Sequence, residues 1–493
     1  MSRIAIRRFL RSKESLATLL ILLVPVGSAC AADRPNIVFM MSDDQAWNGL
    51  SVPMHPDLDW SKSSIVETPN LEKLAAQGMR FTAAYAPASV CAPTRISLQT
   101  GKSPAAVHWT KASRSVTAVD GYKMIGPRNV RQIDRNETTI GELLRHAGYR
   151  TAHFGKWHIN GGGPAAHGYD ESDGDIGNEY AFQYRDPNPA DIFGMAKRAA
   201  AFMEQSKKAN KPFFIQMSWH ALHAPQNALK TTLAKYAQRM KSSVDEKRVG
   251  SAAIAENLDT GVGMVIDAID RLDLADNTFV IYMSDNGSGG GGGRRRGGGL
   301  SGGKGSVWEG GIRSPFIIRG PGIPENSWCH ERIVGYDLFP TYCEWAGIAS
   351  SKLPPQIEGG SIVNLLDDGK GLVKRPREEM VFHFPHYQSG DGPHSALFLG
   401  NYKLMKFYET ERLALFDIAA DISEQNDLST QQPQKVTVLD KLLEQYLLDV
   451  DAQMAVSNPQ YDSAKPPVSR KARGGRDKTK KTRKPGTNKR ANQ

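Results

Sequence analysis

Short, nearly continuous apolar runs that end in polar residues constrain the fold of this sequence more than any other feature. Residues 34–42 form one such run, residues 211–219 a second and residues 278–284 a third. A strand with one face in water alternates apolar and polar residues, whereas a strand of a parallel sheet is covered on both faces and stays apolar. The runs therefore predict buried strands of an α/β protein with a parallel sheet.

The polar residues at the ends of two of these runs indicate a cation site. Asp43 and Asp44 follow the first run, and Asp285 and Asn286 follow the third. Adjacent carboxylates repel each other, and a bound cation is the usual reason for keeping them together at the end of a buried strand. Carboxylate and amide oxygens suit a hard divalent ion. Taken singly, each pair also fits an ordinary solvated turn.

The segment from Ser89 to Gly101 predicts a place for an anion. Pro93 fits the first turn of a helix, where its missing N–H is not needed and its φ is already helical. Cys91 should then lie at or just before the helix N-terminus, facing the positive end of the helix dipole. Arg95 comes four residues after Cys91 and so lies on the same face. A small buried thiol beside a surface arginine would show the same local pattern.

Two helices are predicted between the strands. Residues 68–78 begin with Thr68 as an N-cap and end at a glycine, which is typical of a packing helix. A second helix over residues 139–146 leads into a strand over residues 149–154.

Lys156 and His158 follow the strand over residues 149–154. Because they are two residues apart at a strand end, they project to the same side, and both can reach one anion. A polar surface would give the same pair of residues.

The pattern changes near residue 376. Residues 403–408 and 413–417 predict a hairpin, and residues 436–450 predict an amphipathic helix. Residues 381–387 form an aromatic and histidine cluster near a strand.

The cluster over residues 381–387 could bind a sugar. His383, His386 and Tyr387 offer rings and hydrogen-bonding groups, while Phe382 and Phe384 alternate to the other face. We therefore expect this cluster to lie over the mouth of a pocket. The alternative is that it is an ordinary core strand.

The ends of the chain account for its positive charge. Residues 1–31 combine basic residues, a short apolar run and small residues, as an export signal does, and Cys30 permits a lipoprotein variant. From residue 465 onward, twelve lysines and arginines face one aspartate, which predicts a disordered basic tail. Of the formal net charge of +10, about −5 is left for residues 32–464. A mildly acidic body gives no reason to expect a nucleic acid partner.

Four cysteines are too few for a disulfide scaffold. Cys329 and Cys343 could pair in an oxidising compartment, but their spacing does not decide it.

Taken together, the motifs resemble those of the formylglycine-dependent sulfatases of the alkaline phosphatase superfamily. The Cys91 segment continues into Leu98, Thr100 and Gly101. Lys156 and His158 stand in a Gly-Lys-Trp-His sequence. Ten positions match the family pattern in order: Asp43, Asp44, Cys91, Arg95, Lys156, His158, His223, Asp285, Asn286 and Lys304.

Some matches depend on the resemblance alone. His223 is assigned by its distance from Pro225, although Leu222 stands where the family has a proline, and His220 is expected to be structural. Lys304 lies in the segment of the family pattern that follows a glycine-rich loop over residues 288–299. Arg294 to Arg296 in that loop could steer an anionic substrate. Thr94 also departs from the family, which more often has serine there.

The resemblance implies an α/β fold like that of alkaline phosphatase, with a large mixed sheet flanked by helices and a smaller C-terminal antiparallel-sheet subdomain. We accordingly expect a catalytic domain over residues 32–375, the subdomain over residues 376–455 and the disordered tail over residues 456–493.

The resemblance also implies a sulfuric ester hydrolase, with a sulfated carbohydrate as the expected substrate. In this family the cysteine, here Cys91, is oxidised to formylglycine by a maturation enzyme, and the hydrated aldehyde is the nucleophile. Calcium, rather than magnesium, would be held by Asp43, Asp44, Asp285 and Asn286 and would touch the modified Cys91. The catalytic set would be Cys91, Arg95, Lys156, His158, His223 and Lys304.

Two other functions fit the sequence. One is a phosphate or phosphonate monoester hydrolase of the same superfamily, and the other is a noncatalytic protein that binds sulfated glycans. An exported protein, periplasmic or secreted, without a stable membrane span is expected in each case.

Overall fold

The computed structural model describes residues 34–113, 121–183, 185–240, 246–288, 299–388 and 390–465. The predicted export signal, the Arg294 to Arg296 triplet and the tail beyond residue 465 lie outside these residues. Within the part of the chain that is described, no helix is both long and apolar enough to cross a membrane.

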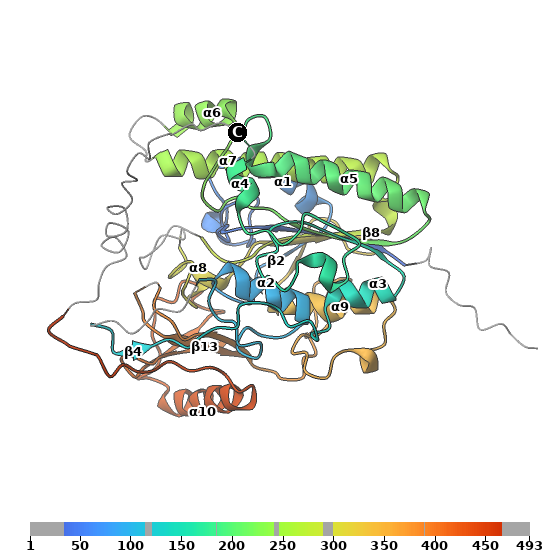
Figure 1. Cartoon of the computed structure of the whole chain (residues 1–493). Coiled ribbons are helices and arrows are strands. Elements are labelled where there is room, and N and C mark those ends of the chain that lie inside the picture. The colour runs from blue at the N-terminus through green and yellow to red at the C-terminus, as the bar shows by residue number, and fades with distance from the viewer. Residues whose placement is uncertain are drawn as a thin grey trace, which may run out of the picture.

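A mixed sheet forms the centre of the molecule (Figure 1). Its strands run in the order β10 (Ser327–Cys329), β2 (Met79–Phe81), β9 (Phe316–Arg319), β8 (Thr278–Ser284), β1 (Asn36–Ser42), β7 (Phe213–Ser218), β5 (Arg150–Gly155) and β6 (Glu171–Ser172). β1 is parallel to both of its neighbours, β8 and β7, whereas β9 is antiparallel to both β8 and β2. The predicted strands are therefore confirmed, and they occupy the middle of the sheet.

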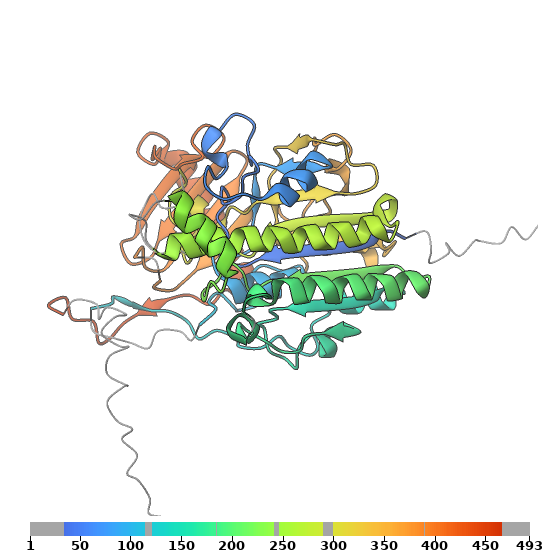
Figure 2. The same cartoon turned by 90° about the horizontal axis from the view of Figure 1, so that it is seen from above.

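Helices cover both faces of this sheet. One face carries α1 (Pro69–Ala76), α5 (Ile192–Lys208) and α7 (Glu246–Arg271), with α4 (Glu179–Gln183) and α6 (Lys230–Met240) beside them. Figure 2 shows α5 and α7 side by side across that face. The other face carries α2 (Cys91–Thr100), α3 (Ile140–His146) and α9 (Leu338–Trp345).

β1 shows why its sequence is apolar throughout. Val38 and Met40 pack into the core under α5 and α7, whereas Ile37, Phe39 and Met41 pack into the core around α2, α3 and α9. Successive side chains of a strand point to opposite faces, so a strand covered on both faces has no position left for a polar residue.

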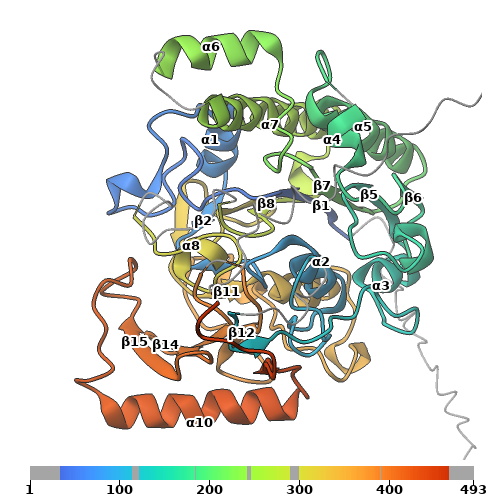
Figure 3. The ribbon, with the colours of Figure 1, turned by 60° about the vertical axis from the view of Figure 1, so that its left-hand side comes forward.

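A second sheet is antiparallel and lies at the C-terminal end. It consists of β12 (Met380–Phe384), β13 (His394–Leu399), β14 (Tyr402–Phe407) and β15 (Arg412–Asp417), in that order. α10 (Pro433–Asp449) covers its outer face, as Figure 3 shows. Its inner face packs against residues around α8 (Glu309–Ile312). The predicted hairpin and amphipathic helix are confirmed.

Minor elements complete the fold. β3 (Ala84–Tyr85) pairs with β11 (Ile333–Val334), and β4 (Met124–Ile125) pairs with β16 (Val456–Ser457). Short 3-10 helices occupy Asp59–Ser61, Pro164–His167, Pro189–Asp191, Ala275–Asn277, Gly335–Asp337, Ser350–Lys352 and Val363–Leu365. Because β16 is paired, the predicted start of a disordered tail at residue 456 is too early.

A group of buried charges joins the two sheets. Lys403 on β14 lies 3.0 Å from Glu309 and 2.7 Å from Glu424, measured from Nζ to carboxylate oxygens. Arg313 donates to Glu309 over 2.7 Å, and the backbone N–H of Glu309 donates to Glu424 over 2.9 Å. We call these four residues the interface cluster.

One local expectation differs from the structure. Thr68 does not cap α1, since its hydroxyl accepts the N–H of Ser51, and the carboxylate of Asp259 accepts the N–H groups of Asn70 and Leu71 instead. A buried carboxylate from a distant helix thus does the work of the local cap.

Cys329 and Cys343 are both buried free thiols in this structure. They do not form the disulfide that the sequence left open.

Candidate functional site

The register of β1 and β8 brings three carboxylates together. Ser42 lies opposite Ser284, so the residues that follow the two strands meet at one edge of the sheet. Asp43 and Asp285 are fully buried there, and Asp44 is partly buried. The N–H of Asp44 donates to Asp285 over 3.2 Å.

The first residue of α2 adds a sulfur to these carboxylates. Cys91 Sγ lies 3.3 Å from Asp43 Oδ1 and 3.9 Å from Asp44 Oδ1. One ligand atom from each of Asp43, Asp44, Cys91 and Asp285 lies within 4.8 Å of all the others. This spacing suits one cation held between the four side chains.

Asn286 supplies a further argument for a cation. Its Nδ2 donates to Asp44 Oδ1 over 2.8 Å, but its Oδ1 is buried and accepts no hydrogen bond from any residue that the structure describes. An unsatisfied buried carbonyl oxygen is costly. An oxygen-preferring ion such as calcium would satisfy it, so the residues present fit such an ion.

Arg95 and Lys156 are buried cations that face the carboxylates. Arg95 NH2 lies 2.7 Å from Asp285 Oδ2 and 3.5 Å from Asp43 Oδ2. Lys156 Nζ donates to Asp43 Oδ2, and both cationic side chains are at most 2 % exposed. They therefore hold two of the carboxylates in their charged form.

Lys304 closes the ring of charges. Its Nζ donates to Asp44 Oδ1 and lies 3.2 Å from Cys91 Sγ. Three carboxylates thus meet three cations, in a set that we call the central cluster: Asp43, Asp44, Asp285, Arg95, Lys156 and Lys304. These formal charges cancel, so a divalent cation would leave an excess of positive charge that an anionic group can neutralise.

Glycine makes the position of Lys156 attainable. Gly155 ends β5 with φ at 93°, and a Cβ there would lie 2.2 Å from the carbonyl oxygen of Ser218. Only glycine fits this turn and this approach to β7. The turn leads directly into Lys156, whose N–H donates to the same Ser218 carbonyl over 2.8 Å.

The central cluster sets unusual pKa values. Burial raises the pKa of Asp43, but Lys156, Arg95 and Lys304 outweigh it and hold that pKa well below its ordinary value. Burial and the negative charge of Asp43 raise the pKa of Asp285 to about 6.

The sulfur of the site is not ionised. Burial, followed by the charges of Asp285 and Asp43, raises the pKa of the Cys91 thiol far above its ordinary value. An unmodified Cys91 is therefore a neutral thiol, and the thiolate needed for nucleophilic attack by sulfur is not available.

His158 lies beside the central cluster as predicted. Burial, followed by the positive charges of Lys156 and Arg95, lowers its pKa to about 2. Its Nδ1 is buried and has no partner among the described residues. Burial and the surrounding positive charges therefore keep this imidazole neutral, with one ring nitrogen free for a hydrogen bond.

Asn178 joins the two histidines that follow β7. Its amide nitrogen lies 2.9 Å from Nδ1 of His223, and its amide oxygen lies 3.2 Å from Nδ1 of His220. His223 lowers the pKa of Asp43, which puts it near the carboxylates, and His220 is fully buried with Nε2 unpartnered among the described residues. Sequence reasoning missed Asn178, which stands in no recognisable motif.

The predicted sugar-binding cluster is not at a pocket mouth. His383 is 6 % exposed, and its ring contacts Ser395 and the carbonyl of Gln453. His386 is 1 % exposed and lies 2.8 Å from the hydroxyl of Thr110. Their burial corrects the expectation that these imidazoles contact a sugar directly.

Tyr387 is only partly buried, and its hydroxyl accepts the N–H of Met124 over 3.1 Å.

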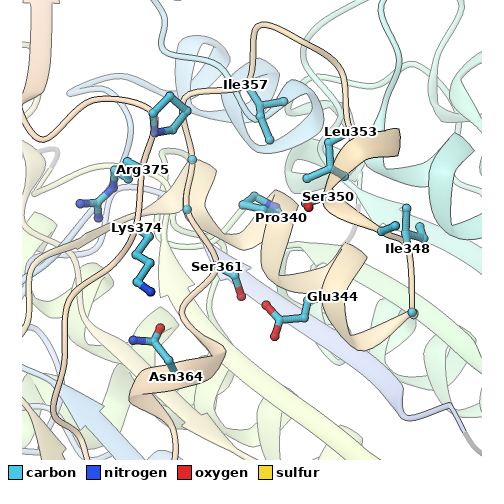
Figure 4. Close-up of a pocket in the computed structure, with 15 residues that line it drawn as sticks. Pro340, Glu344, Ile348, Ser350, Leu353, Ile357, Ser361, Asn364, Lys374 and Arg375 are labelled. Carbon is cyan, nitrogen blue, oxygen red and sulfur yellow. The ribbon is translucent and has the colours of Figure 1, made fainter.

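A cavity of about 810 Å³ lies away from the central cluster. Figure 4 shows its lining around α9, with Ile348, Leu353 and Ile357 on one side and Lys374 and Asn364 on the other. None of the predicted site residues lines it. A second pocket, of about 380 Å³, includes His158 and therefore borders the site.

Known proteins resemble most of this chain. A family model described as sulfatase matches residues 35–348, and one described as the C-terminal part of N-sulphoglucosamine sulphohydrolase matches residues 303–453. A sulfatase of Formosa agariphila is 28% identical, over 83% of this chain and 87% of its own. The N-acetylgalactosamine-6-sulfatase of Canis lupus familiaris is 28% identical, over 77% of this chain and 73% of its own.

A crystal structure of Ps i-CgsB in complex with k-i-k-neocarrahexaose has a similar fold. Its TM-score is 0.68 at 22% identity, with 87% of this chain and 94% of that chain covered. At this level of identity the likeness bears on the fold alone.

Proposed function

Because the chain belongs to the sulfatase family and is therefore an enzyme that hydrolyses sulfate esters, we propose that it removes sulfate from a sulfated carbohydrate, using calcium and a formylglycine made from Cys91. The observation that carries the proposal is the central cluster, which surrounds Cys91 with balanced charge and leaves Asn286 Oδ1 unsatisfied. The carbohydrate is supported by the relative named for N-acetylgalactosamine 6-sulfate.

Calcium would be held by Asp43, Asp44, Asp285 and Asn286. When bound, it would polarise the sulfate oxygens and neutralise the charge that develops on them. Lys156 and Lys304 then bind the nonbridging oxygens from the sides, since their ammonium groups already point at the carboxylates of the site. Arg95 keeps Asp285 charged and oriented.

A formylglycine would supply the nucleophile that the Cys91 thiol does not. The neutral thiol of Cys91 is a poor nucleophile in this setting. A hydrated aldehyde supplies one hydroxyl that attacks sulfur and a second that allows sulfate to be released.

Protons are assigned to the two histidines and Lys304. His158 has a buried Nδ1 without a partner among the described residues, so we assign it to the second hydroxyl of the hydrated aldehyde; a bound sulfate group would offset the lysine and arginine charges that, together with burial, lower its pKa. His223 and Lys304 are the groups that can protonate the leaving oxygen, and Asn178 holds the ring of His223 in place.

The test combines mass spectrometry with turnover. The Cys91 peptide should show loss of sulfur and gain of an aldehyde oxygen, while the Cys329 and Cys343 peptides keep their thiols. Sulfate release from sulfated sugars should exceed phosphate release from matched phosphate esters. An unmodified Cys91 in active enzyme, or faster phosphate release, would contradict the proposal and favour a phosphate or phosphonate monoester hydrolase.

Maturation and location follow from the same proposal. A formylglycine-generating enzyme is the required partner, and export through residues 1–31 would deliver the protein to the periplasm or the medium.

A further inference from the structure

The pocket of about 380 Å³ beside the central cluster is built to hold negative charge. His158 belongs to its lining, so the pocket opens next to the groups that handle the sulfate. Lys111, Arg128 and Arg131 also line it, and none of the lining residues that the structure describes is acidic.

The guanidinium groups of the two arginines in this pocket make no ion pair with other described residues. Both Arg128 and Arg131 are exposed, and among the residues that the structure describes neither guanidinium has an ion-pair or hydrogen-bond partner. Arg131 holds the pocket wall through its backbone, because its carbonyl accepts the side-chain N–H of Asn160 over 2.6 Å. A guanidinium presents a fixed fork of donors that matches a carboxylate or a sulfate.

Asn129, between the two arginines, is oriented toward the same task. Its Oδ1 accepts both the backbone N–H and the hydroxyl of Thr110, over 3.0 and 3.1 Å. Its Nδ2 is buried and has no partner among the described residues. With the oxygen occupied, the amide can only offer its N–H groups to whatever enters the pocket.

His386 fixes that orientation from behind the pocket wall. Its Nε2 lies 2.8 Å from the Thr110 hydroxyl, which has a single hydrogen and gives it to Asn129. Nε2 of His386 must therefore donate, which leaves Nδ1 without a proton, and Nδ1 is indeed buried without a partner among the described residues. Burial, followed by the charge of Lys111, lowers the pKa of His386 to about 2, consistent with a neutral ring.

We propose that Arg128, Asn129 and Arg131 form a subsite for a second anionic group of the substrate, a sulfate or a carboxylate on the same sugar or its neighbour, with His386 as a positioning residue that acts through Thr110. The inference rests on the proposed function, because a second anion matters only if the substrate is a sulfated carbohydrate. The enzyme then prefers glycans with two anionic groups to those with one.

The test measures binding apart from turnover. Full-length protein carrying Cys91→Ala is loaded with calcium and titrated by calorimetry with a monosulfated sugar, its disulfated form and a sulfated disaccharide that contains a uronic acid. At least one of the two dianionic ligands should bind about tenfold or more tightly than the monosulfated sugar. Which one gains identifies sulfate or carboxylate as the second group.

Variants then locate the preference. The double variant Arg128→Gln with Arg131→Gln should bring the ratio of the dissociation constants for the monosulfated sugar and the preferred dianionic ligand close to one. Asn129→Asp should have the same effect, because it replaces N–H donors with a negative charge. Arg145→Gln removes an exposed arginine that pairs with Asp170 outside the pocket, and it should leave the ratio unchanged. A ratio that survives the double variant, equal binding of all three ligands, or no binding would overturn the subsite.

His386 is tested by a conservative pair. His386→Ala should lower the ratio, whereas His386→Gln, whose amide can still donate to Thr110, should restore it. Equal effects of both variants would contradict the positioning role. Sulfate release by the wild-type enzyme tests the proposed function separately. If the enzyme releases no sulfate from any sugar but the binding ratio still depends on the arginines, the subsite is supported and the proposed substrate is wrong.

Discussion

The central cluster and the interface cluster are both groups of buried charges, yet they differ in how completely they are satisfied. In the interface cluster, Lys403 contacts both glutamates, and no side-chain nitrogen or oxygen of its four members is left buried without a partner. Around the central cluster, Asn286 Oδ1 and Arg95 Nε remain unpaired among the described residues.

This difference separates a structural role from a chemical one. Buried charges that satisfy one another have no capacity for a ligand, and their removal is felt as lost stability. Buried polar atoms left without partners cost stability unless something else binds them, and beside the buried carboxylates and the cysteine of the site a bound ion would satisfy Asn286 Oδ1.

The largest effect is expected at Cys91. Cys91→Ala should leave a soluble, folded protein with sulfatase turnover at background, because the reaction needs a hydroxyl nucleophile built on this residue. Turnover of an aryl sulfate and circular dichroism would measure the two properties. Cys343→Ala removes a buried thiol far along the chain and should keep turnover per folded molecule. More than trace activity in the Cys91 variant would disprove the mechanism.

Removing the charge of two buried aspartates should affect different properties, calcium binding at Asp285 and stability at Asp337. Asp285→Asn keeps the shape of the site but removes an anionic oxygen, so calcium affinity and kcat/KM should each fall by about a hundredfold or more. Asp337→Asn breaks an equally buried pair with Arg375 at 2.6 Å and should reduce stability while calcium binding persists. Calorimetric calcium titration distinguishes them, and an unchanged calcium affinity in Asp285→Asn would remove that residue from the ligand set.

The interface cluster should respond through stability. Lys403→Met leaves Glu309 and Glu424 buried without their shared cation, so the free energy of unfolding should fall by about 3–5 kcal/mol, with kcat/KM per folded molecule kept. Urea unfolding and turnover measure this. In the presence of calcium, Lys156→Met in the central cluster should instead abolish turnover and lower the free energy of unfolding by less than Lys403→Met does. If both variants lost mainly stability, the contrast between the clusters would fail.

The smallest effect is a pH dependence of stability. Burial and the negative charge of Glu309 outweigh the positive charge of Lys403 and raise the pKa of Glu424 from 4.5 to about 7. A raised pKa means that the folded protein holds this proton better than the unfolded chain does, so the contribution is complete below pH 4.5 and is lost as pH rises to 7. Its size is about 1–3 kcal/mol.

Glu424→Gln should remove this slope. The melting temperature of the wild type should fall relative to that of the variant as pH rises from 4.5 to 7, and parallel curves would show that Glu424 does not take up the proton.

The ligand set was predictable because its members sit at the ends of recognisable elements. Asp43 and Asp285 follow apolar strands, and Cys91 precedes a helix-starting proline. The pairing of β1 with β8 brings the two aspartates together, and the first residue of α2 adds the sulfur. The same local logic failed for Thr68, since a local cap signal cannot show that Asp259 arrives from α7.

Residues defined only by tertiary contacts could not be predicted. Glu309 and Lys403 are separated by 94 positions and look like ordinary surface charges in the sequence. Asn178 and Asn129 act through single side-chain amides in loops, for which composition and periodicity carry no signal. His386 did stand out in the sequence, but burial gives it a position behind the pocket rather than at its mouth.

The burial of α2 has a consequence for the order of events in the life of the protein. Every residue of α2 is buried, and Cys91 itself is 2 % exposed beneath Lys304 and the carboxylates. If Cys91 is converted to formylglycine, as proposed, the enzyme that oxidises it must reach a side chain that the finished fold covers. We therefore expect the conversion to precede folding, so that a chain that folds with its thiol intact stays inactive.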